Sequence, residues 1–161
     1  MDAITYALPA VLLSQLLTPQ RIRVPLTATD KAAVLRELVE VVANGEGASA
    51  DDLLLAVEER EQVLSTGIGH GVAIPHGRSG RIADLRVAAG VTLAPIEFGS
   101  LDGEPVRLVF LLVAPESQAG MHVKVLSRIT RLVRQPLVRE RLVRATSGDE
   151  FARVLREAEG L

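Results

Sequence analysis

The sequence predicts a single α/β layered domain. Apolar residues form short runs, or alternate with other residues, in four stretches typical of β-strands: residues 21–27, 72–74, 86–94 and 106–114. Around these stretches, apolar residues recur at helical spacing in five or six segments. Strands and helices that follow one another in this way predict a sheet covered by helices. Composition alone does not choose the topology of that sheet.

The N-terminal part predicts a short helix and a strand. Residues 8–17 are apolar, but they are too few to span a bilayer, and no Lys or Arg precedes them as in a signal peptide. We therefore expect a short helix packed on the domain, with no membrane insertion. In residues 21–27, Ile22, Val24 and Leu26 fall on one face, which predicts the first strand.

Two helices are expected next. Thr29 or Asp30 can cap the first helix, and Asn44-Gly45 ends it. Residues 49–52 fit a capping box that opens the second helix, with Arg60 near its end.

The second half of the chain predicts two strands and then helices. Residues 86–94 are rich in Val and Ala, and residues 106–114 are almost entirely apolar, as in a central strand buried on both faces. Residues 122–133 then follow a helical pattern. Pro136 starts a further short helix, and Ser147 with Glu150 fits a capping box for the last one.

Composition excludes several classes of function. The chain has 161 residues, no cysteine, 2% aromatic residues and a net charge of −2. The net charge gives no electrostatic attraction to nucleic acid, and the few aromatic residues give no platform for stacking bases. Without cysteine there are neither disulfides nor thiolate chemistry. With no targeting segment, we expect a cytoplasmic protein.

Residues 60–78 organise the rest of the sequence. Gly67, Gly69 and Gly71 alternate, so the backbone there can take positive φ or approach a ligand closely. Pro75 is expected to end the strand at residues 72–74, because it has no N–H for a ladder. His76 then lies just past a strand end with a restrained backbone, which suits a nucleophilic nitrogen.

The same segment carries a resemblance to a known family. The pattern R-E-x-x-x-S-T-G-I-G-x-G-V-A-I-P-H-G resembles the phosphohistidine motif of type 2 enzyme IIA domains of the phosphotransferase system, the fructose/mannitol class that includes the nitrogen-regulatory IIA. The motif of the nitrogen-regulatory branch also tends to end in P-H-G plus a basic residue. A second histidine, His122, follows 46 residues later (122 − 76), with Val123 where the family usually has Leu. The resemblance extends from about Leu13 to Leu155.

The resemblance implies a fold and a set of site residues. The fold would be a three-layer sandwich, in which a mixed sheet lies between helices and His76 and His122 meet at one rim. His76 would be phosphorylated, His122 would donate to a phosphoryl oxygen, and Arg60 would bind phosphate through its planar guanidinium. Ser65 and Thr66 either bond the phosphoryl group or are turn residues.

The chemistry needs one free nitrogen on His76. Phosphoryl transfer depends on positioning and charge neutralisation. The other ring nitrogen should donate a hydrogen bond that fixes the tautomer, and a backbone carbonyl is the expected acceptor.

Rival sites are poorly supported. Gly67-x-Gly69 lacks the third glycine of a dinucleotide fingerprint and follows a helix. The spacing of His70 and His76 matches no metal-ligand motif. We expect neither a metal nor a cofactor, and we expect His70 and Arg78 to be solvated surface residues.

Two function classes remain. The expected function is a phosphocarrier phosphorylated on His76 by a histidine-containing phosphocarrier protein of the HPr or NPr type, acting as a nitrogen-regulatory IIA on a regulated transporter or kinase. The alternative is a sugar-specific IIA that passes the phosphoryl group to a fructose/mannitol-type IIB domain. The sequence names neither the sugar nor the acceptor, and it leaves open whether the protein is a phosphotransferase component or a regulatory phosphoprotein.

Overall fold

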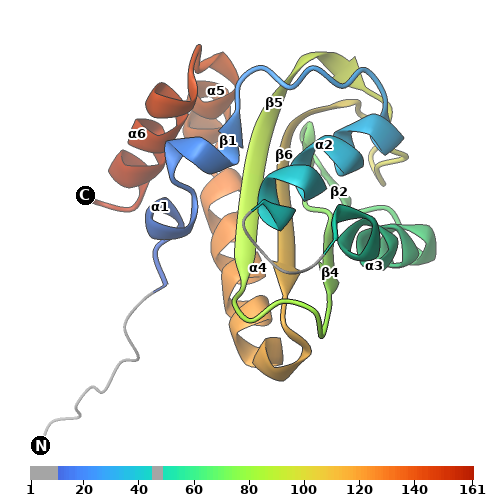
Figure 1. The fold of residues 1–161 in the computed structure, drawn as a ribbon. Helices are drawn as coiled ribbons and strands as arrows, with labels where there is room; N and C mark the ends of the chain where they lie inside the picture. The colour runs from blue at the N-terminus through green and yellow to red at the C-terminus, as the bar shows by residue number, and fades with distance from the viewer. Residues whose placement is uncertain (1–10, 45–48) are drawn as a thin grey trace, which may run out of the picture.

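Three layers make up the part of the chain that the computed structural model describes, residues 11–44 and 49–161. A mixed sheet lies between two groups of helices (Figure 1). The helices are α1 (Leu13–Leu16), α2 (Lys31–Ala43), α3 (Ala50–Val63), α4 (Ala119–Val133), α5 (Pro136–Arg144) and α6 (Gly148–Ala158), with short 3-10 turns η1 (Pro19–Arg21) and η2 (Glu116–Gln118). The strands are β1 (Ile22–Arg23), β2 (Gly67–Gly69), β3 (Val72–Ala73), β4 (His76–Arg78), β5 (Arg86–Ile96) and β6 (Val106–Ala114). The expected α/β sandwich is confirmed.

The sheet is organised around β6. The strand order is β1-β5-β6-β3-β2, and β4 also pairs with β6. β5 and β6 are antiparallel, whereas β1 pairs parallel with β5, and both β3 and β4 pair parallel with β6. β2 and β3 form an antiparallel hairpin.

β3 and β4 are two segments of one interrupted strand. Val72 pairs with Leu108 and His76 with Leu112, so the register is the same on both sides of the interruption (108 − 72 and 112 − 76). Pro75 gives no N–H, but its carbonyl accepts from the Leu112 N–H at 3.0 Å. The strand ends before Pro75, as predicted, but pairing with β6 resumes directly after it, which the sequence did not predict. His76 is the first residue of β4, and strand pairing holds its backbone.

The first strand is shorter than the sequence predicts. Only Ile22–Arg23 pairs as β1, and beyond it the backbone returns to the sheet at Leu26, whose N–H donates to the Val91 carbonyl at 2.8 Å. Pro25 lies between these two contacts and has no N–H to donate, which interrupts the ladder there.

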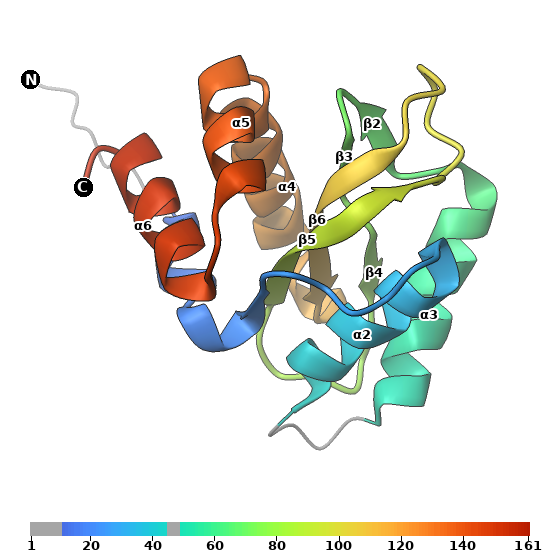
Figure 2. The same ribbon diagram turned by 90° about the horizontal axis from the view of Figure 1, so that it is seen from above.

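Helices cover both faces of the sheet (Figure 2), and a hydrophobic core lies on each face. On β6, Leu108, Phe110 and Leu112 point towards α1, α4, α5 and α6, whereas Val109 and Leu111 point towards α2 and α3. This alternation explains why the β6 sequence is apolar at nearly every position, as expected for a strand buried on both faces.

Helix caps agree with the sequence at several places. Asp30, not Thr29, caps α2 by accepting the Ala33 N–H at 2.8 Å. Ser49 and Ser147 cap α3 and α6. The expected end of α2 at Asn44-Gly45 is seen at Asn44, while Gly45 lies outside the described residues.

The apolar segment at residues 8–17 gives only the short helix α1, and residues 8–10 lie outside the described part. Glu159 at the end of α6 accepts the backbone N–H groups of Leu13 and Ser14 at 2.8 and 2.9 Å. Its carboxylate is fully buried and also accepts from Arg128, so α1 is held against α4 and α6. Within residues 11–44 and 49–161, no helix is both long and apolar enough to cross a membrane.

Candidate active site

Two histidines from different layers meet at one end of the sheet. His76 begins β4, and His122 lies in the first turn of α4, which packs against β6. Their ring centroids are 5.3 Å apart, and the rings are nearly perpendicular, at 83°. The structure therefore brings together the two histidines that the sequence singled out.

The backbone fixes the ring of His76. Its Nδ1 lies 2.8 Å from the carbonyl oxygen of Ile74. A carbonyl only accepts hydrogen bonds, so Nδ1 carries the hydrogen and the neutral ring keeps its lone pair on Nε2. The expected backbone acceptor is thus the Ile74 carbonyl, and Nε2 is the ring nitrogen left free of a hydrogen.

The surroundings of His76 keep its ring neutral. Burial lowers the pKa of His76, and the positive charges of Arg60 and Arg78 act in the same direction. The Ile74 carbonyl and the Glu61 carboxylate oppose this shift without cancelling it. Near pH 7 the ring is therefore mostly unprotonated, as a nucleophile requires.

His122 is buried deeper than His76. Only 4% of its surface is exposed. Burial, followed by the charges of His76 and Arg78, lowers the pKa of His122 to about 4. Its Nδ1 is buried with no hydrogen-bond partner among the described residues. A neutral ring with no acceptor beside Nδ1 favours its hydrogen on Nε2, so His122 can donate a hydrogen bond without carrying charge.

Arg60 stands at the end of α3. Its Nη1 donates to the Leu64 carbonyl at 2.8 Å, so one arm of the guanidinium caps the helix to which it belongs. Its charge nevertheless lowers the pKa of His76. A guanidinium has five N–H donors, and this contact uses only one of its nitrogens.

Ser65 and Thr66 already hold protein partners. The Ser65 hydroxyl donates to the Phe98 carbonyl at 2.8 Å and accepts from the Gly67 N–H at 3.1 Å. The Thr66 hydroxyl donates to Glu61 Oε1 at 2.5 Å. A phosphoryl contact from either hydroxyl requires that one of these bonds be exchanged, so their role in binding phosphate stays a prediction.

Arg78 is a site residue that the sequence reasoning missed. It is exposed, as expected for a solvated side chain, but its charge lowers the pKa of both His76 and His122. The sequence feature that could have indicated this role is the position of Arg78 directly after P-H-G.

Gly77 has a packing reason that the sequence did not reveal. A Cβ added there would lie 3.0 Å from the backbone carbon of Ala56 and 3.1 Å from the nitrogen of Val57, both in α3. No side chain fits between β4 and α3, so glycine lets the strand that carries His76 lie directly against the helix that carries Arg60.

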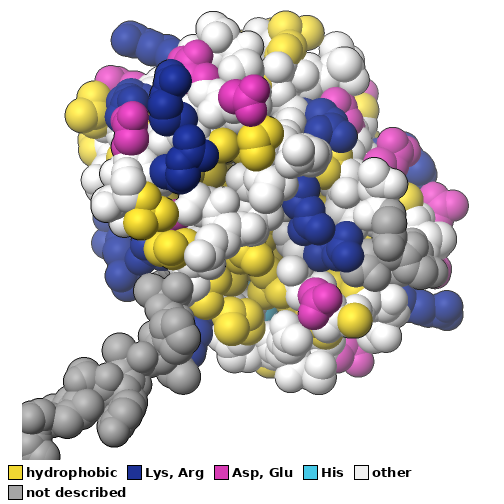
Figure 3. All heavy atoms as spheres, turned by 60° about the vertical axis from the view of Figure 1, so that its left-hand side comes forward, with side chains coloured by type: hydrophobic (Ala, Val, Ile, Leu, Met, Phe, Trp, Pro, Cys, Tyr) yellow, Lys and Arg dark blue, Asp and Glu magenta, His cyan; other side chains and the backbone are white. Residues whose placement is uncertain are grey.

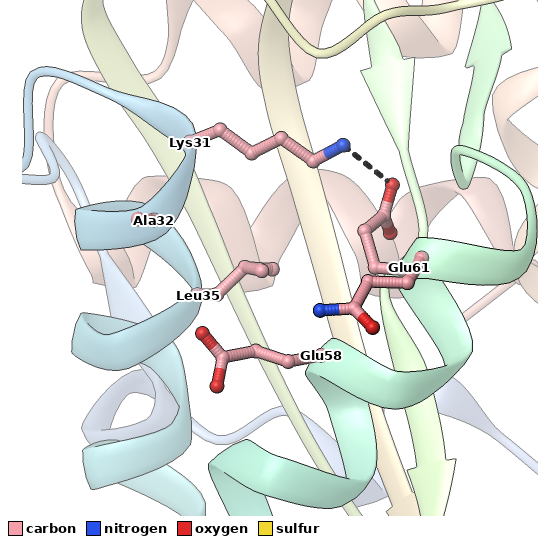
Figure 4. A pocket seen from close by; sticks show the side chains of 6 residues that line it. Lys31, Ala32, Leu35, Glu58 and Glu61 are labelled. Carbon is pink, nitrogen blue, oxygen red and sulfur yellow. Dashed lines mark ion pairs between the residues drawn. The ribbon is translucent and has the colours of Figure 1, made fainter.

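Half-buried Lys31 and buried Glu61 form an ion pair beside the site. Lys31 Nζ lies 2.8 Å from Glu61 Oε2, and it reaches from α2 to α3 (Figure 4). The pair borders a hollow of about 350 Å³ lined by Lys31, Ala32, Leu35, Glu58, Glu61 and Gln62. Burial acts to raise the pKa of Glu61, but hydrogen bonds from Lys31 and Thr66 outweigh it, so the carboxylate stays ionised.

The third histidine lies elsewhere. His70 is exposed at the tip of the β2–β3 hairpin with a φ of 57°, and its N–H donates to Asp102 at 3.0 Å. Among the described residues, no three side chains of the metal-ligating types gather into a cluster.

Two exposed apolar side chains lie next to His122 in the sequence. Met121 and Val123, on either side of His122 in the sequence, are 38% and 61% exposed. Figure 3 shows hydrophobic side chains gathered near the lower end of the molecule. Exposed apolar side chains of this kind suit contact with another protein.

Comparison with known proteins gives the class. Residues 15–158 match the family model described as the phosphoenolpyruvate-dependent sugar phosphotransferase system, EIIA 2. Over 130 residues the chain is 35% identical to the nitrogen regulatory protein of Bradyrhizobium diazoefficiens, covering 81% of this chain and 85% of that protein.

Solved structures agree. The nitrogen regulatory protein IIA-Ntr of Neisseria meningitidis matches with a TM-score of 0.84 and 31% identity, covering 89% of this chain and 98% of that one. Enzyme IIAMTL of Escherichia coli, in a complex with phosphorylated enzyme IIBMTL, matches with a TM-score of 0.74 and 25% identity, covering 88% and 97%. The fold and the family model thus define a type 2 IIA domain. The chain belongs to the EIIA 2 family of the phosphoenolpyruvate-dependent sugar phosphotransferase system, and nitrogen regulatory proteins are among its relatives.

Proposed function

We propose that this protein is a phosphocarrier that accepts a phosphoryl group on His76 Nε2 from a histidine-containing phosphocarrier protein of the HPr or NPr type. The observation that carries the proposal is the hydrogen bond from His76 Nδ1 to the Ile74 carbonyl, which leaves Nε2 as the unprotonated nitrogen. The lowered pKa of His76 supports it, because a protonated ring cannot attack phosphorus.

The transfer step balances without a cofactor. The Nε2 lone pair attacks phosphorus, and the P–N bond of the donor phosphohistidine breaks, returning its electron pair to the donor ring. The ring of His76 gains positive charge, while its Nδ1–H remains hydrogen-bonded to the Ile74 carbonyl. Arg60 and the neutral His122 donate to the phosphoryl oxygens, and Ser65 and Thr66 are further donors if they exchange their present bonds.

We propose that the protein acts as a nitrogen-regulatory IIA in the cytoplasm. The nitrogen regulatory relatives and the P-H-G-R ending of the motif support this assignment. A phosphoryl group adds a charge of about −1.5 to −2. Beside the exposed Met121 and Val123, that charge changes the affinity of any protein docked on this rim, which makes phosphorylation a switch.

The first test is reconstitution. The purified protein is incubated with phosphoenolpyruvate, enzyme I and the phosphocarrier protein, and its intact mass is followed. We expect a gain of one phosphoryl group. His70→Ala should gain the same mass, because His70 lies on a distant hairpin. No gain by the wild type with any phosphocarrier would overturn the proposal.

The second test separates regulation from sugar transport. The phosphorylated protein is mixed with fructose- and mannitol-type IIB domains, and loss of the phosphoryl mass is measured. Rapid transfer to a IIB domain would favour the sugar-specific alternative. The complex of the E. coli relative IIAMTL with phosphorylated IIBMTL supports that alternative. Pull-downs with His76→Ala and with phosphorylated wild type should recover different partners, and identical partner sets would count against the switch.

A further inference from the structure

A continuous chain of hydrogen bonds leads from α2 to the ring of His76. Lys31 Nζ contacts Glu61 Oε2 at 2.8 Å. Glu61 accepts twice from Thr66, from the backbone N–H at 2.9 Å and from the hydroxyl at 2.5 Å. The Thr66 carbonyl accepts the Ile74 N–H at 3.0 Å, and the Ile74 carbonyl accepts His76 Nδ1 at 2.8 Å.

The start of this chain is rigid. Both Glu61 oxygens are occupied, and only 6% of the Glu61 side chain is exposed. Lys31 also donates to the Phe98 carbonyl at 3.0 Å and lies 5.0 Å from the centre of the Phe98 ring. If Glu61 changed rotamer, it would leave a buried charge without a partner. This cost holds the carboxylate in one rotamer.

The far end of the chain needs this support. Ile74 lies in the interruption between β3 and β4, and the next residue, Pro75, has no N–H to anchor the Ile74–Pro75 peptide on the sheet. The carbonyl that orients His76 belongs to that peptide. On its N-terminal side, that peptide is held by the Thr66 carbonyl, which accepts the Ile74 N–H, and on its C-terminal side the sheet holds the Pro75 carbonyl.

We propose that Lys31, Glu61 and Thr66 are positioning residues for His76. The ion pair fixes Thr66, Thr66 fixes Ile74, and the Ile74 carbonyl holds the hydrogen of His76 on Nδ1. Thr66 thus acts on the reaction through the backbone, whether or not its hydroxyl also reaches phosphate. The consequence for transfer rests on the proposed function, but the effect on the tautomer does not.

The experiment measures the tautomer and the transfer rate separately. Ring nitrogen shifts of His76 are recorded by NMR in the unphosphorylated protein, for wild type, Glu61→Gln, Thr66→Val and Thr66→Ser. Glu61→Gln keeps the shape of the side chain but replaces one acceptor oxygen by a donor. Thr66→Val replaces the hydroxyl by a methyl group, whereas Thr66→Ser keeps the hydroxyl and loses the methyl group. Glu58→Gln is the matched control, because Glu58 borders the same hollow on α3 and takes no part in the chain (Figure 4).

We expect the wild type and Glu58→Gln to show the Nδ1–H form alone. Glu61→Gln and Thr66→Val should show a mixture with the Nε2–H form and accept the phosphoryl group about three- to tenfold more slowly, as loss of one hydrogen bond would cause. Thr66→Ser should keep both the wild-type tautomer and the wild-type rate. Wild-type shifts and rates in folded Glu61→Gln and Thr66→Val would overturn the proposal. If the variants show a shifted tautomer but the wild type takes up no phosphoryl group, the positioning role stands and the proposed function is refuted.

Discussion

The rings of His76 and His122 meet edge to face, with centroids 5.3 Å apart. Burial is the main cause that lowers the pKa of His122, and the charges of His76 and Arg78 lower it further. Two imidazolium ions this close would repel each other. The pair therefore consists of two neutral rings that differ in where the hydrogen lies: on Nδ1 in His76, which leaves a lone pair on Nε2, and on Nε2 in His122.

Removing a donor to the phosphoryl group should slow transfer without abolishing it. A charge-assisted hydrogen bond contributes roughly 1.5–3 kcal/mol. We therefore expect Arg60→Ala and His122→Ala to be phosphorylated about ten- to a hundredfold more slowly. A phosphorylation time course measures this, with circular dichroism to check folding. Arg36→Ala, an exposed arginine on α2, is the control. A folded Arg60→Ala protein with the wild-type rate would remove Arg60 from the site, and the same result for His122→Ala would leave that histidine with a structural role.

Arg78→Ala should raise the pKa of both histidines. The positive charge of Arg78 disfavours protonation of His76 and of His122, so its removal makes both rings easier to protonate. NMR titration of the two rings measures the shift. Arg81→Ala, three residues further along, should leave both titrations unchanged. Unchanged titrations in Arg78→Ala would show that Arg78 has no electrostatic role here.

His122 should make the protein sensitive to acid. The folded state holds its pKa at about 4, against 6.5 in the unfolded chain, so unfolding takes up a proton as the pH falls below 6.5. Stability is therefore full above pH 6.5 and declines as the pH falls towards 4. Between pH 7 and pH 5 this group accounts for a loss of about 2 kcal/mol.

His122→Gln cannot titrate. Urea unfolding at pH 7 and pH 5 should show a smaller acid-induced loss in this variant than in the wild type. Equal losses in the two proteins would mean that His122 is not held neutral in the folded state.

Gly77→Ala should destabilise the protein and disturb the site. The added methyl group meets the α3 backbone at 3.0–3.1 Å, and backbone atoms cannot move aside as a flexible side chain can. We expect a cost of about 1–3 kcal/mol, typical of overpacking. Gly80→Ala is the control, because the nearest atom to its added Cβ, Glu116 Oε2, is 4.0 Å away. Equal stability of the two variants would show that β4 can move away from α3.

Periodic segments were predictable from the sequence. α4 follows its helical spacing, with Val125 and Ile129 buried, and β6 shows the unbroken apolar run of a central strand. β4 was not predictable, because His76–Arg78 has neither alternation nor length. Only the constant register with β6 shows that it continues β3.

The site was predictable only in part. The family motif selected the histidines, and the hydrogen bond between His76 and the Ile74 carbonyl was expected in kind but not in identity. The Lys31–Glu61 pair was missed, because the residues lie on different helices and their meeting depends on how α2 packs on α3. No spacing rule in one sequence encodes such a contact.

The central claim is that His76 carries the phosphoryl group, and intact-mass spectrometry of reconstituted wild type and His76→Ala tests it most directly. Both proteins are incubated with phosphoenolpyruvate, enzyme I and the phosphocarrier protein. We predict that the wild type gains one phosphoryl group, which is lost in acid and kept in base, and that folded His76→Ala gains none. A His76→Ala protein that gains the same mass at a comparable rate would contradict the account.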